Sequence, residues 1–461
     1  MLTPTVLFVL ALAAGLYMAW NIGANDVANA MGTSVGSGAL SFRRAIILAG
    51  IFEFCGAFFV GSNVAETIQG GIVSPRALAP RRASVVKTPS PPGGGRAAAS
   101  AAAAAPAGAE IRAAELREPG REAMRKTAMK LALGMLAALL AAAVWLNIAT
   151  FFGQPVSTTH TIIGAVIGFA IVDTGLASVN WWAMGKIVGS WIISPLAGGI
   201  VAYILYRCIR RFVLRSPQPI HMAERAVPLG FGAVVLIITL SILYKGLPRL
   251  RLDLPLLTAL PLALTAGLVA AVTARTVIYR RMRSRPPPGQ RYDVVERWFG
   301  RIQPVTACYM AFAHGANDVA NAVGPLAGVL ELVSGGEPAA RAVMPAWLLA
   351  LGGAAIVVGL ATYGHKVIEA VGKKITEITP SRGFSAEFAT ASTVLVCSKL
   401  GLPISTTFVL VGAVMGVGVA RGFGAIDLRV IRRILTSWVI TIPVAAILSA
   451  LIYCVLGAIE G

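Results

Sequence analysis

Long apolar stretches separated by short polar strings run through the whole chain. A helix needs about 20 residues to cross a bilayer, and several of the apolar stretches are shorter than that. We expect the short ones beside Ser/Thr or Asn/Asp strings to form broken or re-entrant helices, which membranes tolerate only where the backbone lines a protected cavity. The apolar stretches lie near residues 5–22, 44–62, 128–150, 156–172, 184–206, 227–244, 255–279, 303–314, 344–363, 385–400, 404–420 and 430–457. The pattern predicts an all-α polytopic membrane protein with about 10–12 membrane segments.

One polar string occurs twice. Residues 23–30 and 315–322 both read Gly-Ala-Asn-Asp-Val-Ala-Asn-Ala, an identity that chance does not explain. Transporters place matched, Gly-interrupted polar segments in two halves and build the substrate site between them. We therefore predict two repeats, over 1–206 and 302–461, joined by basic cytoplasmic loops with linking helices over 207–301.

A second string is also repeated. It reads Pro-Val-Ser-Thr-Thr-His over 155–160 and Pro-Ile-Ser-Thr-Thr-Phe over 403–408, and an apolar run follows each copy. Proline followed by serine and threonine is typical of a helix start. The free N–H groups and the positive dipole end of such a start attract anions. Two starts that meet in the middle of the membrane would make a cradle for an oxyanion.

The Asn-Asp strings offer the complementary chemistry. Asp26 and Asp318 lie in apolar surroundings, where an unpaired carboxylate is costly. Na⁺ prefers oxygen ligands, and carboxylates, Asn amides and backbone carbonyls freed beside Gly23 or Gly315 would supply them. An aspartate can also accept the acidic hydrogen of HPO₄²⁻ or H₂PO₄⁻, which sulfate lacks. Hydrogen bonding that merely holds helices together is the alternative, but two strings that are each repeated favour a site.

Composition and charge narrow the class of protein. Hydrophobic residues make up 56% of the 461 residues and charged residues only 13%, and a soluble protein of this composition would aggregate. The net charge of +20 comes from arginines clustered in loops between apolar spans. Positive cytoplasmic loops explain that placement better than nucleic-acid binding does. The five cysteines are scattered without CxxC spacing, which indicates neither a metal site nor a disulfide framework. We expect no cofactor.

The segment 75–126 departs from the rest of the chain. It is rich in Pro, Gly, Ala and Arg, which predicts a disordered or weakly helical loop inserted into the first repeat. It lies outside the repeated strings, so we expect transport not to require it. The first apolar run continues into the polar string without a cleavage site, which indicates a retained helix and not a signal peptide.

The two repeated pairs of strings resemble those of the inorganic phosphate transporter (PiT) family, of the sodium/phosphate symporter type. Glu53 and the string over 64–68 also resemble the segment that follows the first motif in that family. The resemblance covers nearly the whole chain and implies an inverted-repeat fold with phosphate between the halves and cations beside it. The implied substrate-binding residues are Asn25, Asp26, Asn29, Ser157, Thr158, Thr159, Asn317, Asp318, Asn321, Ser405, Thr406 and Thr407. The implied cation-binding residues are Asp26, Asp318, Glu53 and Glu387.

Histidines break the symmetry between the copies. Family members often carry His after both Ser-Thr-Thr strings, whereas here His160 is matched by Phe408, which weakens a histidine-based proton relay. His314 precedes only the second Asn-Asp string, so the repeat gives it less weight as a ligand-orienting residue.

Three classes of function compete at this point. The first is a symporter that imports phosphate across the plasma (inner) membrane, driven by Na⁺, with alternating access and no bound cofactor. The second is a proton-coupled carrier, or a carrier of metal-phosphate or of another oxyanion such as sulfate. The third is an enzyme or an anion channel. An enzyme would need a nucleophile and base set or a metal cluster, and a channel would need a pore ring, but the sequence shows none of these. The expected partners are inorganic phosphate, Na⁺ or H⁺ and the lipid bilayer, without nucleic acid, and a homodimer is left open.

Overall fold

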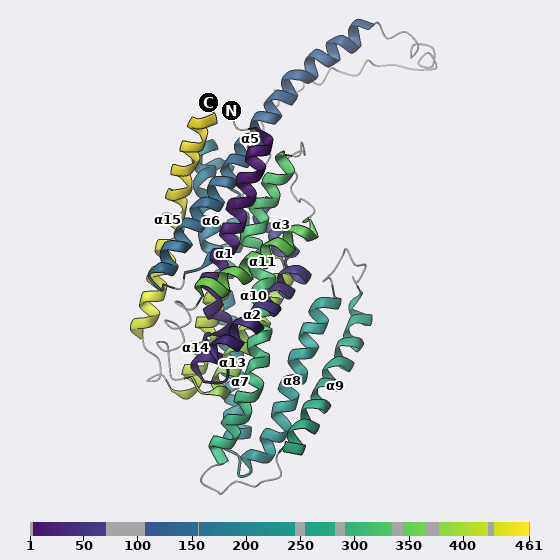
Figure 1. Ribbon diagram of the computed structural model, residues 1–461, viewed down its shortest axis with the longest axis vertical. Helices are drawn as coiled ribbons and strands as arrows, with labels where there is room; N and C mark the ends of the chain where they lie inside the picture. Colours follow the sequence, from purple (N-terminus) through teal and green to yellow (C-terminus); the bar gives the residue numbers. More distant parts are fainter. Residues whose placement is uncertain are drawn as a thin grey trace, which may run out of the picture.

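The computed structural model describes residues 3–70, 107–154, 156–244, 254–281, 291–333, 344–364, 378–422 and 428–460. The described residues are almost all helical, without a strand among them (Figure 1). The first half holds α1 (Pro4–Gly36), α2 (Phe42–Val60), α3 (Ser62–Gly70), α5 (Ala107–Phe151), α6 (Thr158–Thr174), η2 (Leu176–Ser178) and α7 (Trp181–Cys208). A π-helical turn η3 (Ile209–Leu214) leads to α8 (Pro219–Leu243) and α9 (Leu256–Arg281). The second half holds α10 (Arg291–Val333), α11 (Ala346–Tyr363), α13 (Pro380–Lys399), α14 (Thr406–Arg421) and α15 (Leu428–Glu460).

The all-α membrane architecture is confirmed. In the described part of the chain, seven helices are long and apolar enough to span a bilayer, and α6 and α14 are shorter apolar helices. The expectation that the Asn-Asp strings break their helices was wrong. Both strings lie inside continuous helices, α1 of 33 residues and α10 of 43 residues. A continuous helix satisfies its own backbone groups in the apolar interior, so the polar side chains reach the site without unwinding.

The glycines of the two strings permit close helix packing. A Cβ atom on Gly23 would lie 1.9 Å from the backbone oxygen of Ile356 in α11, and one on Gly315 would lie 2.1 Å from that of Glu53 in α2. Small residues let membrane helices approach at backbone distance. The predicted role of these glycines in freeing carbonyls for a cation is therefore replaced by a packing role.

The two halves of the chain interlock. Helix α1 packs against α11 and helix α10 against α2, so each Asn-Asp helix contacts a helix of the other half. The same exchange recurs between α6 and α15 and between α14 and α7. This reciprocal pairing is what two related repeats around an approximate two-fold axis would give. The inverted orientation of the repeats and their boundaries stay predictions.

The insert and the linker contain helices. Residues 75–106 of the predicted insert lie outside the described residues, whereas 107–126 form the first turns of α5, which extend past the helical bundle (Figure 1). Within 207–301, α8 and α9 pack against each other as a hairpin beside the bundle (Figure 1). Helices α8 and α9 thus lie within the segment predicted to link the two repeats, while the boundaries of that segment stay a prediction.

Valine at position 23 should prevent the protein from folding normally. Its Cβ would overlap the backbone of α11, which cannot move aside as a flexible side chain could. We expect Gly23→Val to cost at least about 3 kcal/mol of stability and to remove the monodisperse peak in fluorescence-detected size-exclusion chromatography. Gly185→Val in α7 is the control, because a Cβ there meets nothing within 4 Å. Equal yields of the two variants would contradict the close approach.

Candidate substrate and cation site

Both Ser-Thr-Thr strings begin helices, as predicted. Ser157 caps α6 and accepts a hydrogen bond from the His160 amide at 3.2 Å. Ser405 caps α14 and accepts one from the Phe408 amide at 3.3 Å. The first turn of each helix thus begins within the protein interior, where its remaining N–H groups lack intrahelical partners. Pro155, the first residue of one string, lies outside the described residues.

Each Asn-Asp string holds the helix start of the opposite half. The Asn29 amide on α1 donates to Thr407 Oγ1 on α14 at 2.8 Å. The Asn321 amide on α10 donates to Thr158 Oγ1 and Thr159 Oγ1 on α6, at 3.2 Å each. The four strings therefore converge on one place, and each pair of strings joins the first half of the chain to the second.

The two aspartates have different surroundings. Asp318 Oδ2 accepts from Thr406 Oγ1 at 2.9 Å, and its Oδ1 accepts from the Asn317 amide at 2.6 Å and from the Asn321 amide at 3.5 Å. Asp26 Oδ1 accepts from the Asn29 amide at 3.3 Å, but its Oδ2 has no hydrogen-bond partner. Asp26 therefore keeps an acceptor oxygen for a further group.

Two of the predicted substrate-binding residues, Asn25 and Asn317, bind to backbone groups of the segments that precede α6 and α14. Asn25 donates to the carbonyl of Gln154 at 3.2 Å and accepts from the amide of Val156 at 3.3 Å. Asn317 donates to the carbonyl of Ile404 at 2.8 Å. Both asparagines thus fix the segment that precedes a helix start. Their role is to aim α6 and α14, as the two capping serines also do.

The site is closed. Each of the twelve residues predicted for substrate binding is at most 3% exposed. Within this buried cluster, Asp26 Oδ2 and Asn321 Oδ1 have no hydrogen-bond partner. Buried polar atoms are nearly always hydrogen-bonded, so unpartnered acceptors in one buried cluster point to a place for a ligand.

His314 joins the carboxylates of three helices. Its Nε2 lies 2.8 Å from Asp318 Oδ2 and 3.8 Å from Asp26 Oδ2, and its Nδ1 lies 3.0 Å from Glu53 Oε1 on α2. These are ion-pair distances without hydrogen-bond angles, since neither ring nitrogen has a hydrogen-bond partner. The ligand atoms of Asp26, His314 and Asp318 lie within 4.8 Å of one another, close enough to hold a cation together.

A second acidic cluster surrounds Glu387 on α13. Its Oε1 accepts from Thr33 Oγ1 at 2.5 Å, Ser34 Oγ at 2.6 Å and the Gln303 amide at 3.2 Å, while its Oε2 accepts from Thr306. All five side chains are buried, and they come from α1, α10 and α13. The predicted cation residues therefore separate into two groups, one beside His314 and one around Glu387.

His160 and Phe408, which break the symmetry of the second string, contact each other. Their ring centroids lie 4.3 Å apart in a stacked arrangement, and Trp191 contacts His160 with a centroid distance of 3.7 Å. The His160 Nδ1 lies 2.6 Å from Ser157 Oγ. The histidine therefore packs in an aromatic cluster directly behind the helix start.

The same architecture occurs in known proteins. Residues 22–449 match the model of the phosphate transporter family. The chain belongs to that family. It is 42% identical to a putative phosphate permease of Pyrococcus abyssi, over 97% of each chain. It is 41% identical to the inorganic phosphate transporter 2-1, chloroplastic, of Arabidopsis thaliana, over 95% of this chain and 70% of the relative. A solved structure described as the sodium-dependent phosphate transporter superposes with a TM-score of 0.83 at 36% identity, covering 98% of this chain and 99% of that one.

Membership in the family confirms the predicted resemblance. This phosphate transporter family member is a multi-pass membrane protein and not an enzyme. Several residues that line its site are not predicted from the sequence, above all Thr33, Ser34, Gln303 and Thr306. One signal could have found Thr33, which follows Asp26 by two helical turns and so lies on the same face of α1.

Proposed function

We propose that the protein imports inorganic phosphate across the plasma (inner) membrane by Na⁺ symport with alternating access. The observation that carries the proposal is the convergence of two helix starts and two Asn-Asp strings on one closed site with unpartnered acceptors at Asp26 and Asn321. Helix N-termini supply donors and positive potential for an oxyanion. The aspartates supply the acceptors and the charge that attract cations.

The site suits a protonated oxyanion. The hydroxyls of Thr158 and Thr407 accept from the Asn321 and Asn29 amides and keep their own O–H donors for a ligand, together with the free N–H groups of the α6 and α14 starts. Asp26 Oδ2 faces the same cluster as an acceptor. Phosphate at neutral pH carries a hydrogen for that acceptor, whereas sulfate carries none. The predicted substrate residues thus divide into groups that touch phosphate and groups that aim the helices.

Charge makes cations necessary. Asp26, Asp318 and Glu53 are fully buried around the single imidazole of His314, and Glu387 is fully buried in the second cluster. Phosphate adds further negative charge in surroundings where uncompensated charge is expensive. Positive ions, either Na⁺ or H⁺, that enter together with phosphate would compensate this charge.

The cluster beside His314 and the cluster around Glu387 both provide oxygen ligands of the kind that a hard cation such as Na⁺ prefers. The hydroxyls of Thr33, Ser34 and Thr306 and the carboxylate of Glu387 form an oxygen-rich cluster, and Asp26 and Asp318 form the other. The solved transporter structure that this chain resembles is sodium-dependent by its description, which also favours Na⁺. Protons are the alternative coupling ions, since carboxylates can bind either.

A closed site between interlocked halves fits alternating access. The site residues are buried and so are accessible from neither side of the membrane in this state. Rocking of the interlocked halves around a fixed site would open the site to one side at a time. A homodimer is compatible with this proposal and is not required by it.

Uptake by purified protein in proteoliposomes tests the proposal. Radiolabelled phosphate is offered with a Na⁺ gradient, with a K⁺ gradient of the same size, and with a pH gradient alone. Excess sulfate serves as competitor, and a parallel arm contains a chelator of divalent cations. We expect uptake only with the Na⁺ gradient, unaffected by sulfate or chelator. Uptake on the pH gradient alone would establish proton coupling, loss with chelator would indicate a metal-phosphate substrate, and no uptake in any arm would overturn phosphate import.

A further inference from the structure

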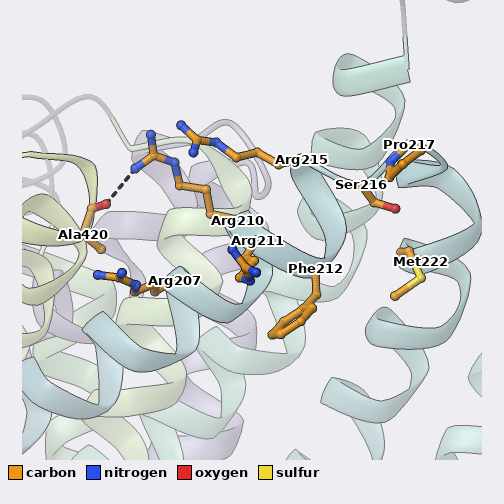
Figure 2. Close-up of a pocket in the computed structure, with 9 residues that line it drawn as sticks. All are labelled: Arg207, Arg210, Arg211, Phe212, Arg215, Ser216, Pro217, Met222 and Ala420. Carbon is orange, nitrogen blue, oxygen red and sulfur yellow. Dashed lines mark hydrogen bonds between the residues drawn. The ribbon is translucent and has the colours of Figure 1, made fainter.

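A separate pocket at the end of α7 is lined by arginines. It has a volume of about 640 Å³, and its walls include Arg207, Arg210, Arg211 and Arg215 but no carboxylate (Figure 2). Ala420, in the last turn of α14, forms the opposite wall. None of these residues belongs to the substrate or cation site described above.

The local backbone keeps the arginines outside the protein core. Helix α7 gives way at Ile209 to the π-helical turn η3, a rare geometry that is frequent at functional sites. Ile209 and Val213 are buried and hold this turn against the bundle, whereas Arg211 and Arg215 are exposed. The turn therefore anchors itself through apolar side chains and presents charged ones to the pocket.

The positive charge of the pocket has no acidic counterpart among the residues that the structure describes. Arg210 donates to the carbonyl of Ala420 at 2.8 Å, and Arg207 contacts the Tyr203 hydroxyl. The side chains of Arg210 and Arg215 both extend toward Ala420 (Figure 2). Like charges that share a pocket repel each other, and an anion between them would relieve this repulsion. Guanidinium groups bind phosphate oxygens with two parallel hydrogen bonds, which makes a phosphate group the best match.

The pocket lies where two candidate membrane spans meet. It sits at the junction of two candidate spans, Trp181–Leu214 and Pro219–Leu243, which lies on the predicted cytoplasmic side. Phe212, which also lines the pocket, is 57% exposed. Ile204, about two turns earlier along the same helical segment, is 54% exposed. A phosphate group at the arginines would thus have an apolar surface beside it, as the headgroup and acyl chains of a lipid require.

We propose that this pocket binds the phosphate group of an anionic ligand. Its placement favours an anionic phospholipid headgroup over a free phosphate ion. The site is distinct from the transport site and its occupancy does not depend on transport, so this inference can fail while the proposed function stands, and the reverse.

Native mass spectrometry of the full-length protein tests the proposal. The purified protein is titrated with phosphatidylglycerol or with phosphatidylcholine, and bound lipid is counted. In the variant Arg211→Gln/Arg215→Gln, phosphatidylglycerol binding should weaken at least about tenfold, because each arginine near a headgroup contributes a sizeable share of the attraction. These two arginines are chosen because their guanidinium groups donate no hydrogen bond to any described residue, so the fold should be kept.

The control variant Arg43→Gln/Arg44→Gln loses the same charge from the exposed start of α2 and should bind lipid as the wild type does. Thermal melting confirms that both variants are folded. A second arm measures inorganic phosphate binding by isothermal titration calorimetry. Selective loss of phosphatidylglycerol binding establishes a lipid site. If Arg211→Gln/Arg215→Gln binds one phosphate ion fewer than the wild type, and phosphatidylglycerol binds no better than phosphatidylcholine, the pocket is a site for free phosphate. Equal binding of both ligands by the wild type and both variants would overturn the proposal.

Discussion

Asp318→Asn is expected to reduce phosphate uptake about 100-fold, since loss of about 3 kcal/mol of charge interaction in a buried site corresponds to two powers of ten. Asparagine keeps the shape of the side chain but removes the charge that faces the cation position. It also replaces an oxygen that accepts from Thr406 and lies 2.8 Å from His314 Nε2. The measurement is the initial rate of radiolabelled phosphate uptake into proteoliposomes.

Asp26→Asn should have a comparable effect, because Asp26 Oδ2 is the unpartnered acceptor at the same point. Asp293→Asn is the matched control, since this carboxylate lies on the same helix as Asp318 but is exposed in its first turn. Orientation and yield in the liposomes are checked by protease protection for all variants. If both buried variants transport phosphate at the wild-type rate, the assignment of the site is wrong.

His314→Gln is expected to destabilise the protein by about 3 kcal/mol, because it leaves buried carboxylates without their positive partner. The imidazole lies within ion-pair distance of Glu53 and Asp318, and all three side chains are fully buried. We expect a lower melting temperature in detergent, together with loss of uptake. The melting temperature is measured by the reaction of buried Cys308 and half-buried Cys55 and Cys397 with a thiol-reactive dye, after the exposed Cys208 and Cys454 have been blocked.

A double variant separates this charge effect from a loss of packing. Adding Glu53→Gln to His314→Gln removes one of the stranded negative charges and should restore part of the lost melting temperature without restoring uptake. Glu53→Gln alone should differ from the wild type by less than His314→Gln does. If the two substitutions simply add, His314 does not act through Glu53, and its pairing with that carboxylate carries no energy.

The local sequence pattern determined the helices of this protein, its repeated strings and several of its site residues. Apolar length and the scarcity of charge predict membrane helices regardless of their packing, and the repeated strings predict two related halves. The capping roles of Ser157 and Ser405 follow from neighbouring residues alone, because a cap bonds to an amide three positions ahead. Asp26 and Asp318 could be selected as site residues because a carboxylate within an apolar span needs a reason to be there.

Only the tertiary structure decided how these parts meet. The continuity of α1 and α10 through their Asn-Asp strings depends on neighbours that accept glycine at backbone distance, and those neighbours, α11 and α2, are far away in the sequence. The contact of His314 with Glu53 arises from that same approach of α10 to α2, and His314 has no counterpart in the first copy to reveal it. The oxygen cluster around Glu387 likewise joins three helices that no local pattern connects. The sequence by itself therefore determined the elements, the duplication and most of the chemistry, whereas packing between distant helices decided which groups share a site.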